Sequence, residues 1–76
     1  MPYNFIVPSI AETQITGFLL GGERTMRGAQ WQVRVYAPHF ELQVSKNGKR
    51  VDALADCPKS IHAMAIDLAS KARFMR

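Results

Sequence analysis

The sequence contains one cysteine and no long apolar segment. Cys57 alone cannot form an intramolecular disulfide or a cysteine-based zinc site, so a disulfide scaffold is excluded and a reducing compartment is favoured. Apolar runs such as residues 18–20 are far shorter than the roughly 20 residues that span a bilayer. The N-terminal residues lack the basic and apolar regions of a signal peptide. We therefore expect a cytoplasmic protein that does not enter a membrane.

The chain also lacks a recognisable catalytic or metal-binding set. Cys57 and His62 are five residues apart, but no third orienting residue or oxyanion donor accompanies this pair. His39 and His62 lack the close spacing of a metal-ligand pair. Residues 21–22 are glycines, but the Gly-Lys-Ser/Thr of a phosphate-binding loop does not follow them. We expect a protein without enzymatic activity, cofactor or metal.

Acidic residues are scarce and unevenly placed. Six Asp and Glu stand against ten Lys and Arg, which gives a formal net charge of +4 over 76 residues. Glu12 and Glu23 are the only charged residues among the first 23, so all ten basic groups follow them. A hydrophobic content of 47% is that of a folded chain. We expect one small domain over residues 1–76, with little room for a deep active site.

Two strands around an Asn-Gly pair are the clearest elements in the sequence. Apolar and polar residues alternate over residues 40–45, which is the period of a half-buried strand. Asn-Gly at residues 47–48 is a strong signal for a type I′ turn, because both central residues need positive φ. This turn pairs Val44 with Val51 and Leu42 with Ala53.

A further strand is expected immediately upstream. Trp31, Val33 and Val35 alternate with polar residues, and the apolar parity changes across residues 38–39. A tight reversal there would pair Val35 with Leu42 and Val33 with Val44, on one face of a sheet. A bulge in one long bent strand is the alternative. We favour the three-stranded antiparallel meander.

The C-terminal stretch is expected to be a helix that begins near Pro58, a residue suited to a first helical turn. Lys71 and Arg73 fall near its end, where cations complement the helix dipole. Packing of its apolar stripe on the sheet would form most of the core, which predicts an α+β fold. The stripe consists of residues at three- and four-residue spacing: Ile61, Met64, Ala65, Leu68, Ala72 and Met75.

The first thirty residues permit more than one interpretation. Residues 3–7 alternate as a short strand would. Ser9 followed by Glu12 fits a capping box, and Gly17 could end a short helix over residues 10–16. Alternatively, residues 15–20 form an extra strand. We favour the helix, and we expect residues 21–29 to form a flexible loop.

Residues 38–72 resemble two kinds of protein. The segment resembles a double-stranded-RNA-binding domain, a family with an αβββα order. The resemblance rests on Pro38-His39, the strand at 40–44, the Asn-Gly turn and an alanine-rich last helix. That resemblance implies that His39 lies in a minor-groove loop and that Lys59 lies at a basic helix start. The same segment resembles small phage anti-CRISPR proteins, which implies an inhibitor that binds a host complex.

Two functional hypotheses follow, and we favour the first. In the first, the chain is a phage accessory protein of the anti-CRISPR kind that inhibits a host nucleic-acid machine by direct protein contact. Its partner-binding residues would be Arg24, Arg27, Ile66 and Phe74, since the last two fall outside the apolar stripe of the helix. In the second, the chain binds nucleic acid through His39, Lys46, Lys49, Arg50 and Lys59. A homodimer formed through the outer helix face is compatible with either hypothesis.

Overall fold

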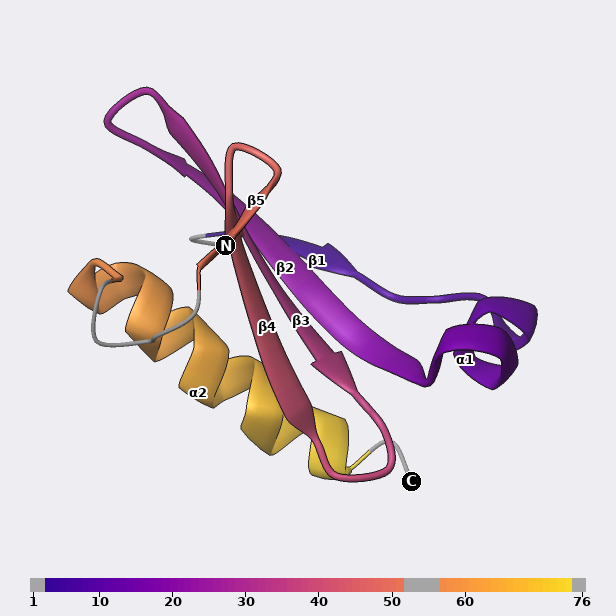
Figure 1. The fold of residues 1–76 in the computed structure, drawn as a ribbon. Helices are drawn as coiled ribbons and strands as arrows, with labels where there is room; N and C mark the ends of the chain where they lie inside the picture. The colour runs from indigo at the N-terminus through magenta and orange to yellow at the C-terminus, as the bar shows by residue number, and fades with distance from the viewer. Residues whose placement is uncertain (1–2, 52–56, 75–76) are drawn as a thin grey trace.

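A computed structural model describes residues 3–51 and 57–74 of the chain. Five strands form one antiparallel sheet in the order β1-β2-β3-β4-β5, and a long helix lies across one face of it (Figure 1). A short helix, α1, lies at the start of β2, away from α2's first turn (Figure 1). The elements are β1 (Asn4–Ile6), α1 (Ile10–Thr16), β2 (Phe18–Met26), β3 (Ala29–Tyr36), β4 (Glu41–Lys46), β5 (Lys49–Val51) and α2 (Lys59–Arg73).

The α+β class and the meander were predicted correctly, but a three-stranded sheet was too small. Val33 pairs with Val44 and Val35 with Leu42, as the tight reversal after β3 requires. At the other end of β4, Asn47 and Gly48 have φ of 52° and 83°, and Val44 pairs with Val51. The expected partner Ala53 lies outside the described residues, as does Met75.

The largest correction concerns residues 21–29, which are not a flexible loop. Residues 18–26 form β2, and Arg27 and Gly28, with φ of 50° and 79°, make the tight turn into β3. Consecutive glycines suggested a loop, but here they permit close packing. A Cβ on Gly21 would lie 2.8 Å from the Val33 carbonyl oxygen, and one on Gly22 would lie 3.2 Å from Leu68. Tertiary packing therefore selects glycine at both positions.

Both alternatives for residues 10–20 are partly correct, because a helix and a strand follow one another there. The Ser9 hydroxyl accepts a hydrogen bond from the Glu12 N–H at 3.1 Å, as the capping-box pattern predicts. Gly17 ends α1 with a φ of 74°, and its N–H donates to the Thr13 carbonyl. Phe18 then begins β2.

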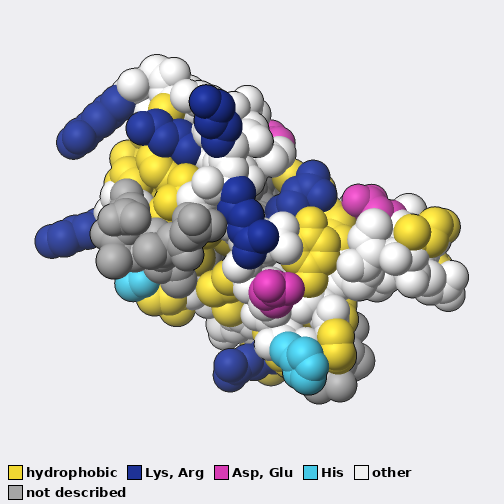
Figure 2. All heavy atoms as spheres, viewed as in Figure 1, with side chains coloured by type: hydrophobic (Ala, Val, Ile, Leu, Met, Phe, Trp, Pro, Cys, Tyr) yellow, Lys and Arg dark blue, Asp and Glu magenta, His cyan; other side chains and the backbone are white. Residues whose placement is uncertain are grey.

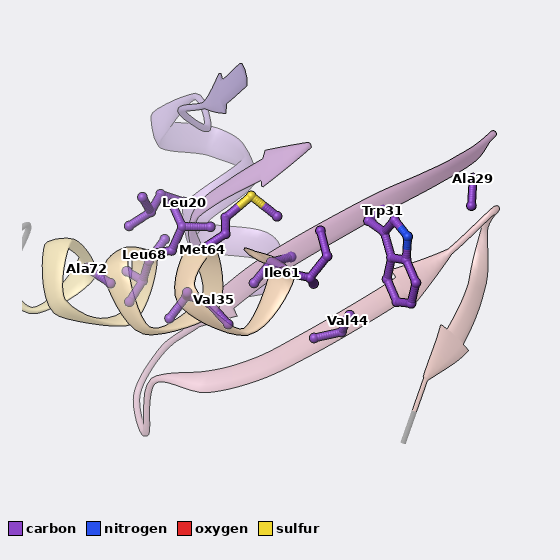
Figure 3. Close-up of a cluster of buried hydrophobic side chains, with 12 residues drawn as sticks. Leu20, Ala29, Trp31, Val35, Val44, Ile61, Met64, Leu68 and Ala72 are labelled. Atoms are coloured by element: carbon purple, nitrogen blue, oxygen red, sulfur yellow. The ribbon is translucent and has the colours of Figure 1, made fainter. Parts of the chain in front are cut away.

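The core lies between α2 and the sheet. The helix contributes Ile61, Met64, Ala65, Leu68 and Ala72, all buried, so five residues of the predicted stripe are confirmed. β3 contributes Trp31, Val33 and Val35, while its intervening residues are half-buried or exposed. Figure 3 places Ala72 at one end of this core and Trp31 with Ala29 at the other, beyond Ile61. In the described part of the chain, neither helix is long and apolar enough to cross a membrane.

The asymmetry of α2 gives a first prediction. Leu68 is fully buried, whereas Ile66, two residues earlier, is 59% exposed. We expect Leu68→Ala to lower the free energy of unfolding by about 2–5 kcal/mol, because it removes packed methyl groups and leaves a cavity. Ile66→Ala is the matched control and should change it by no more than about 0.5 kcal/mol. Urea unfolding followed by circular dichroism measures both, and equal losses would contradict the packing described here.

Candidate nucleic-acid interface

Two turns and the start of α2 gather basic side chains at one end of the sheet. The β2–β3 turn and the β4–β5 turn lie at the same end, close to the first residues of α2 (Figure 1). Several Lys and Arg side chains cover this end of the molecule (Figure 2). The β3–β4 turn, by contrast, lies at the opposite end of the strands.

A cavity of about 720 Å³ opens at the basic end, and we call it the Trp31 cavity. Its cations come from separate elements: Arg27 from the β2–β3 turn, Lys46 from the end of β4 and Lys59 from the start of α2. No aspartate or glutamate occurs among the described residues that line it. The remaining lining residues are Met26, Ala29, Trp31, Cys57, Pro58 and Ser60.

Local hydrogen bonds fix the elements that carry these cations. The Gln30 N–H donates to the Asn47 side-chain oxygen at 2.9 Å, and the Asn47 N–H donates to the Gln30 carbonyl at 2.7 Å. This pair ties the β4–β5 turn to β3. The Ser60 hydroxyl donates to the Met26 sulfur, which joins the end of β2 to α2. The cavity walls are therefore connected to one another as well as to the core.

The register places Lys46 over the indole ring of Trp31. These residues are direct neighbours across β3 and β4, and the Lys46 Nζ lies 5.5 Å from the centre of the ring. Lys46 is also directly opposite Lys49 in the pairing of β4 with β5. Two like charges at paired positions disfavour the free sheet. The arrangement therefore concentrates positive charge beside an aromatic side chain.

The structure regroups the residues that the sequence assigned to two surfaces. Lys46, Lys59 and Arg27 share the Trp31 cavity, although Arg27 was assigned to the other set. Arg50 pairs with Ser45 and therefore projects from the opposite face of the sheet from Lys46. His39 lies exposed in the β3–β4 turn, at the far end from the cavity.

The proposed partner-binding residues are also separated. Arg24 is half-buried on β2, not in a loop, and it lines a second cavity of about 310 Å³ with Tyr3, Ala63 and Asp67. Ile66 and Phe74 are 59% and 87% exposed, so their expected position outside the core is confirmed. Ile66 lies on α2, and Phe74 is the C-cap residue about two turns further along.

Trp31 lines the cavity but was not among the functional residues predicted from the sequence. Its alternation with Val33 and Val35 identified it as core, and it is indeed 5% exposed. The predicted register contained a usable signal, because extending the Val33–Val44 pairing by two residues places Trp31 opposite Lys46. No comparable signal in the sequence indicated the turn at Arg27-Gly28, which brings Arg27 to the cavity, because Arg-Gly predicts a tight turn less strongly than Asn-Gly does.

The candidate residues for a catalytic or metal centre are separated in the structure. Cys57 lines the Trp31 cavity, whereas His62 is exposed on α2 and His39 lies at the other end of the sheet. Within residues 3–51 and 57–74, no three His, Cys, Asp or Glu side chains gather as metal ligands would. Comparison with protein-family models, curated proteins and solved structures found no match to this chain.

The second cavity contains a polar contact that ties the N-terminal strand to α2. The Tyr3 hydroxyl donates to the Asp67 carboxylate, which also pairs with the Lys71 Nζ at 3.0 Å. Burial, followed by the hydrogen bond to Asp67, raises the pKa of Tyr3 to about 12. The hydrogen bond from Tyr3, followed by that from Lys71, lowers the pKa of Asp67 below its ordinary value of 3.8. The contact thus favours a neutral tyrosine and an ionised aspartate.

This contact gives a pH prediction. Because the pKa of Asp67 is lower in the folded than in the unfolded chain, the ionised carboxylate stabilises the fold above pH 3.8, and this contribution is lost as the pH falls below that value. The raised pKa of Tyr3 acts in the other direction, so its contribution is present below pH 10 and is lost as the pH rises towards about 12. Thermal unfolding midpoints across both ranges measure these changes.

Tyr3→Phe is the matched variant for that measurement. It retains the ring and removes the hydroxyl, so we expect a smaller loss of stability in both pH ranges than in the unaltered chain. Identical pH profiles for the two proteins would show that the Tyr3–Asp67 contact does not stabilise the fold.

Proposed function

We propose that this chain is a non-enzymatic module that binds nucleic acid through the phosphate backbone at its basic end. The observation that carries the proposal is the convergence of Arg27, Lys46 and Lys59, from three separate elements, on one cavity. Lys and Arg that neutralise phosphates supply most of the affinity of such proteins, because binding releases condensed counterions. The proposal keeps Lys59 and Lys46 from the nucleic-acid hypothesis, adds Arg27 and omits His39.

The electrostatics of the hairpin support an anionic ligand. Lys46 and Lys49 face one another across β4 and β5. The ammonium of Lys46 contacts the ring of Trp31. A phosphate held between the two ammonium groups would convert their repulsion into a pair of charge-assisted hydrogen bonds. Arg27 and Lys59 extend the same positive region along the cavity. Neighbouring phosphates of one strand could therefore be contacted together.

Salt dependence tests the proposal. Fluorescence anisotropy with a labelled oligonucleotide should give a dissociation constant that rises steeply with salt. Arg27→Gln with Lys59→Gln should weaken binding and reduce the slope of log K against log salt by about 2, since each phosphate contact contributes about 1. The control, Lys71→Gln with Arg73→Gln, removes the same charge at the other end of α2 and should leave the slope unchanged. Equal effects of the two double variants would refute a localised site.

A second candidate function is inhibition of a host nucleic-acid machine of the CRISPR kind by protein contact. The exposure of Ile66 and Phe74 favours it, because two large apolar side chains exposed on α2 and at its C-cap are suited to a partner. The resemblance of residues 38–72 to small phage anti-CRISPR proteins points the same way. Arg24 has a smaller part in this candidate than first expected, because it is half-buried beside α2.

Protection of a phage or plasmid in cells with an active CRISPR system tests this second function. Expression of the chain should restore plasmid transformation, and Ile66→Glu with Phe74→Glu should abolish that effect by placing charges in an apolar interface. Both residues are exposed, so the fold should be retained. Protection that survives this double change but is lost with Arg27→Gln and Lys59→Gln would assign the effect to the basic end instead.

A further inference from the structure

The Trp31 cavity differs from a purely electrostatic phosphate site. Its lining combines apolar side chains from the sheet, Met26, Ala29 and Trp31, with the three cations. A volume of about 720 Å³ is within the range of pockets that hold small organic ligands. Phosphate alone would gain little from apolar walls, because transferring an anion away from water is costly. The cavity is therefore suited to a ligand with both an apolar ring and a negative charge.

We infer that the Trp31 cavity receives an unpaired base of a single nucleic-acid strand, while the adjacent phosphates contact Arg27, Lys46 and Lys59. This inference rests on the proposed nucleic-acid binding and specifies its substrate class. A base within a duplex has both faces stacked and its edge paired, so it cannot enter a cavity without being extruded. An unpaired base carries no such cost. The geometry thus selects single-stranded over double-stranded nucleic acid.

Lys46 links the two parts of this site. Its ammonium lies 5.5 Å from the centre of the Trp31 ring, and Trp31 is 5% exposed. The Lys46 side chain is exposed, and a lysine stem has several rotatable bonds, so its charge can move from the ring to a phosphate at small cost. We expect that movement to make part of the ring accessible to a stacked base, as aromatic residues are in single-strand binding proteins. Phosphate contact and base stacking are therefore coupled through one side chain.

The chain provides its own probes for this inference. Trp31 is the only tryptophan and Cys57 the only cysteine, and both line the cavity. Intrinsic fluorescence and the rate of reaction with a thiol reagent therefore both report on this site. The ligands are a single-stranded oligothymidine and a blunt duplex of equal length. We expect the single strand to quench Trp31 emission, to slow the labelling of Cys57 and to bind at least about tenfold more tightly than the duplex.

Lys46→Met tests the coupling, because it keeps the apolar stem and removes the charge. We expect it to weaken single-strand binding by about tenfold, whereas Lys71→Met, at the other end of the molecule, should have no effect. Circular dichroism confirms that both variants fold. If duplex binds as tightly as single strand, or if binding leaves both Trp31 emission and Cys57 labelling unchanged, the inference is wrong while the proposed function stands. Absence of salt-dependent binding to either ligand would overturn both.

Discussion

The packing of α2 against β2 and β3 is the contact on which the rest of the molecule depends. Ile61, Ala65, Leu68 and Ala72 have no exposed surface, and each faces the sheet. Close approach requires Gly22, where a Cβ would lie 3.2 Å from both Leu68 and Met64. A chain of this length buries only about 60% of the surface that its unfolded form exposes, less than a larger domain does, so a single helix–sheet contact supplies most of the core. The stability of the basic end depends on this same contact.

The position of the Trp31 cavity follows from that packing. α2 crosses the sheet at an angle, and its first turn reaches the end where β2 turns into β3 (Figure 1). The hydrogen bond from Ser60 to Met26 fixes the helix at this point. Trp31 and Ala29 lie at this end of the core in Figure 3, and both line the cavity together with Arg27, Lys46 and Lys59. Apolar and cationic side chains therefore meet in this cavity.

Local sequence signals predicted the elements that are stabilised by their own residues. The Asn47-Gly48 turn, the Ser9 cap and the apolar stripe of α2 each depend on nearby positions, and each was predicted correctly. β2 was missed because its glycines are explained only by distant contacts, with Val33 and Leu68. The cavity was missed for the same reason, since Arg27, Lys46 and Lys59 are brought together by tertiary packing. From their positions in the sequence alone, Arg27 was assigned to a partner-binding surface, and Lys46 and Lys59 were assigned to a nucleic-acid-binding surface.

The two candidate functions use different sides of α2 and do not exclude one another. Lys59 is at the start of the helix beside the cavity, whereas Ile66 is exposed further along it and Phe74 is its C-cap residue. A ligand at the first turn and a partner at Ile66 and Phe74 would therefore contact the same helix without competing for residues. A protein that inhibits a nucleic-acid machine could then hold the strand and the machine together. Loss of one surface by mutation would leave the other intact, so the two proposed activities would be separable in this small domain.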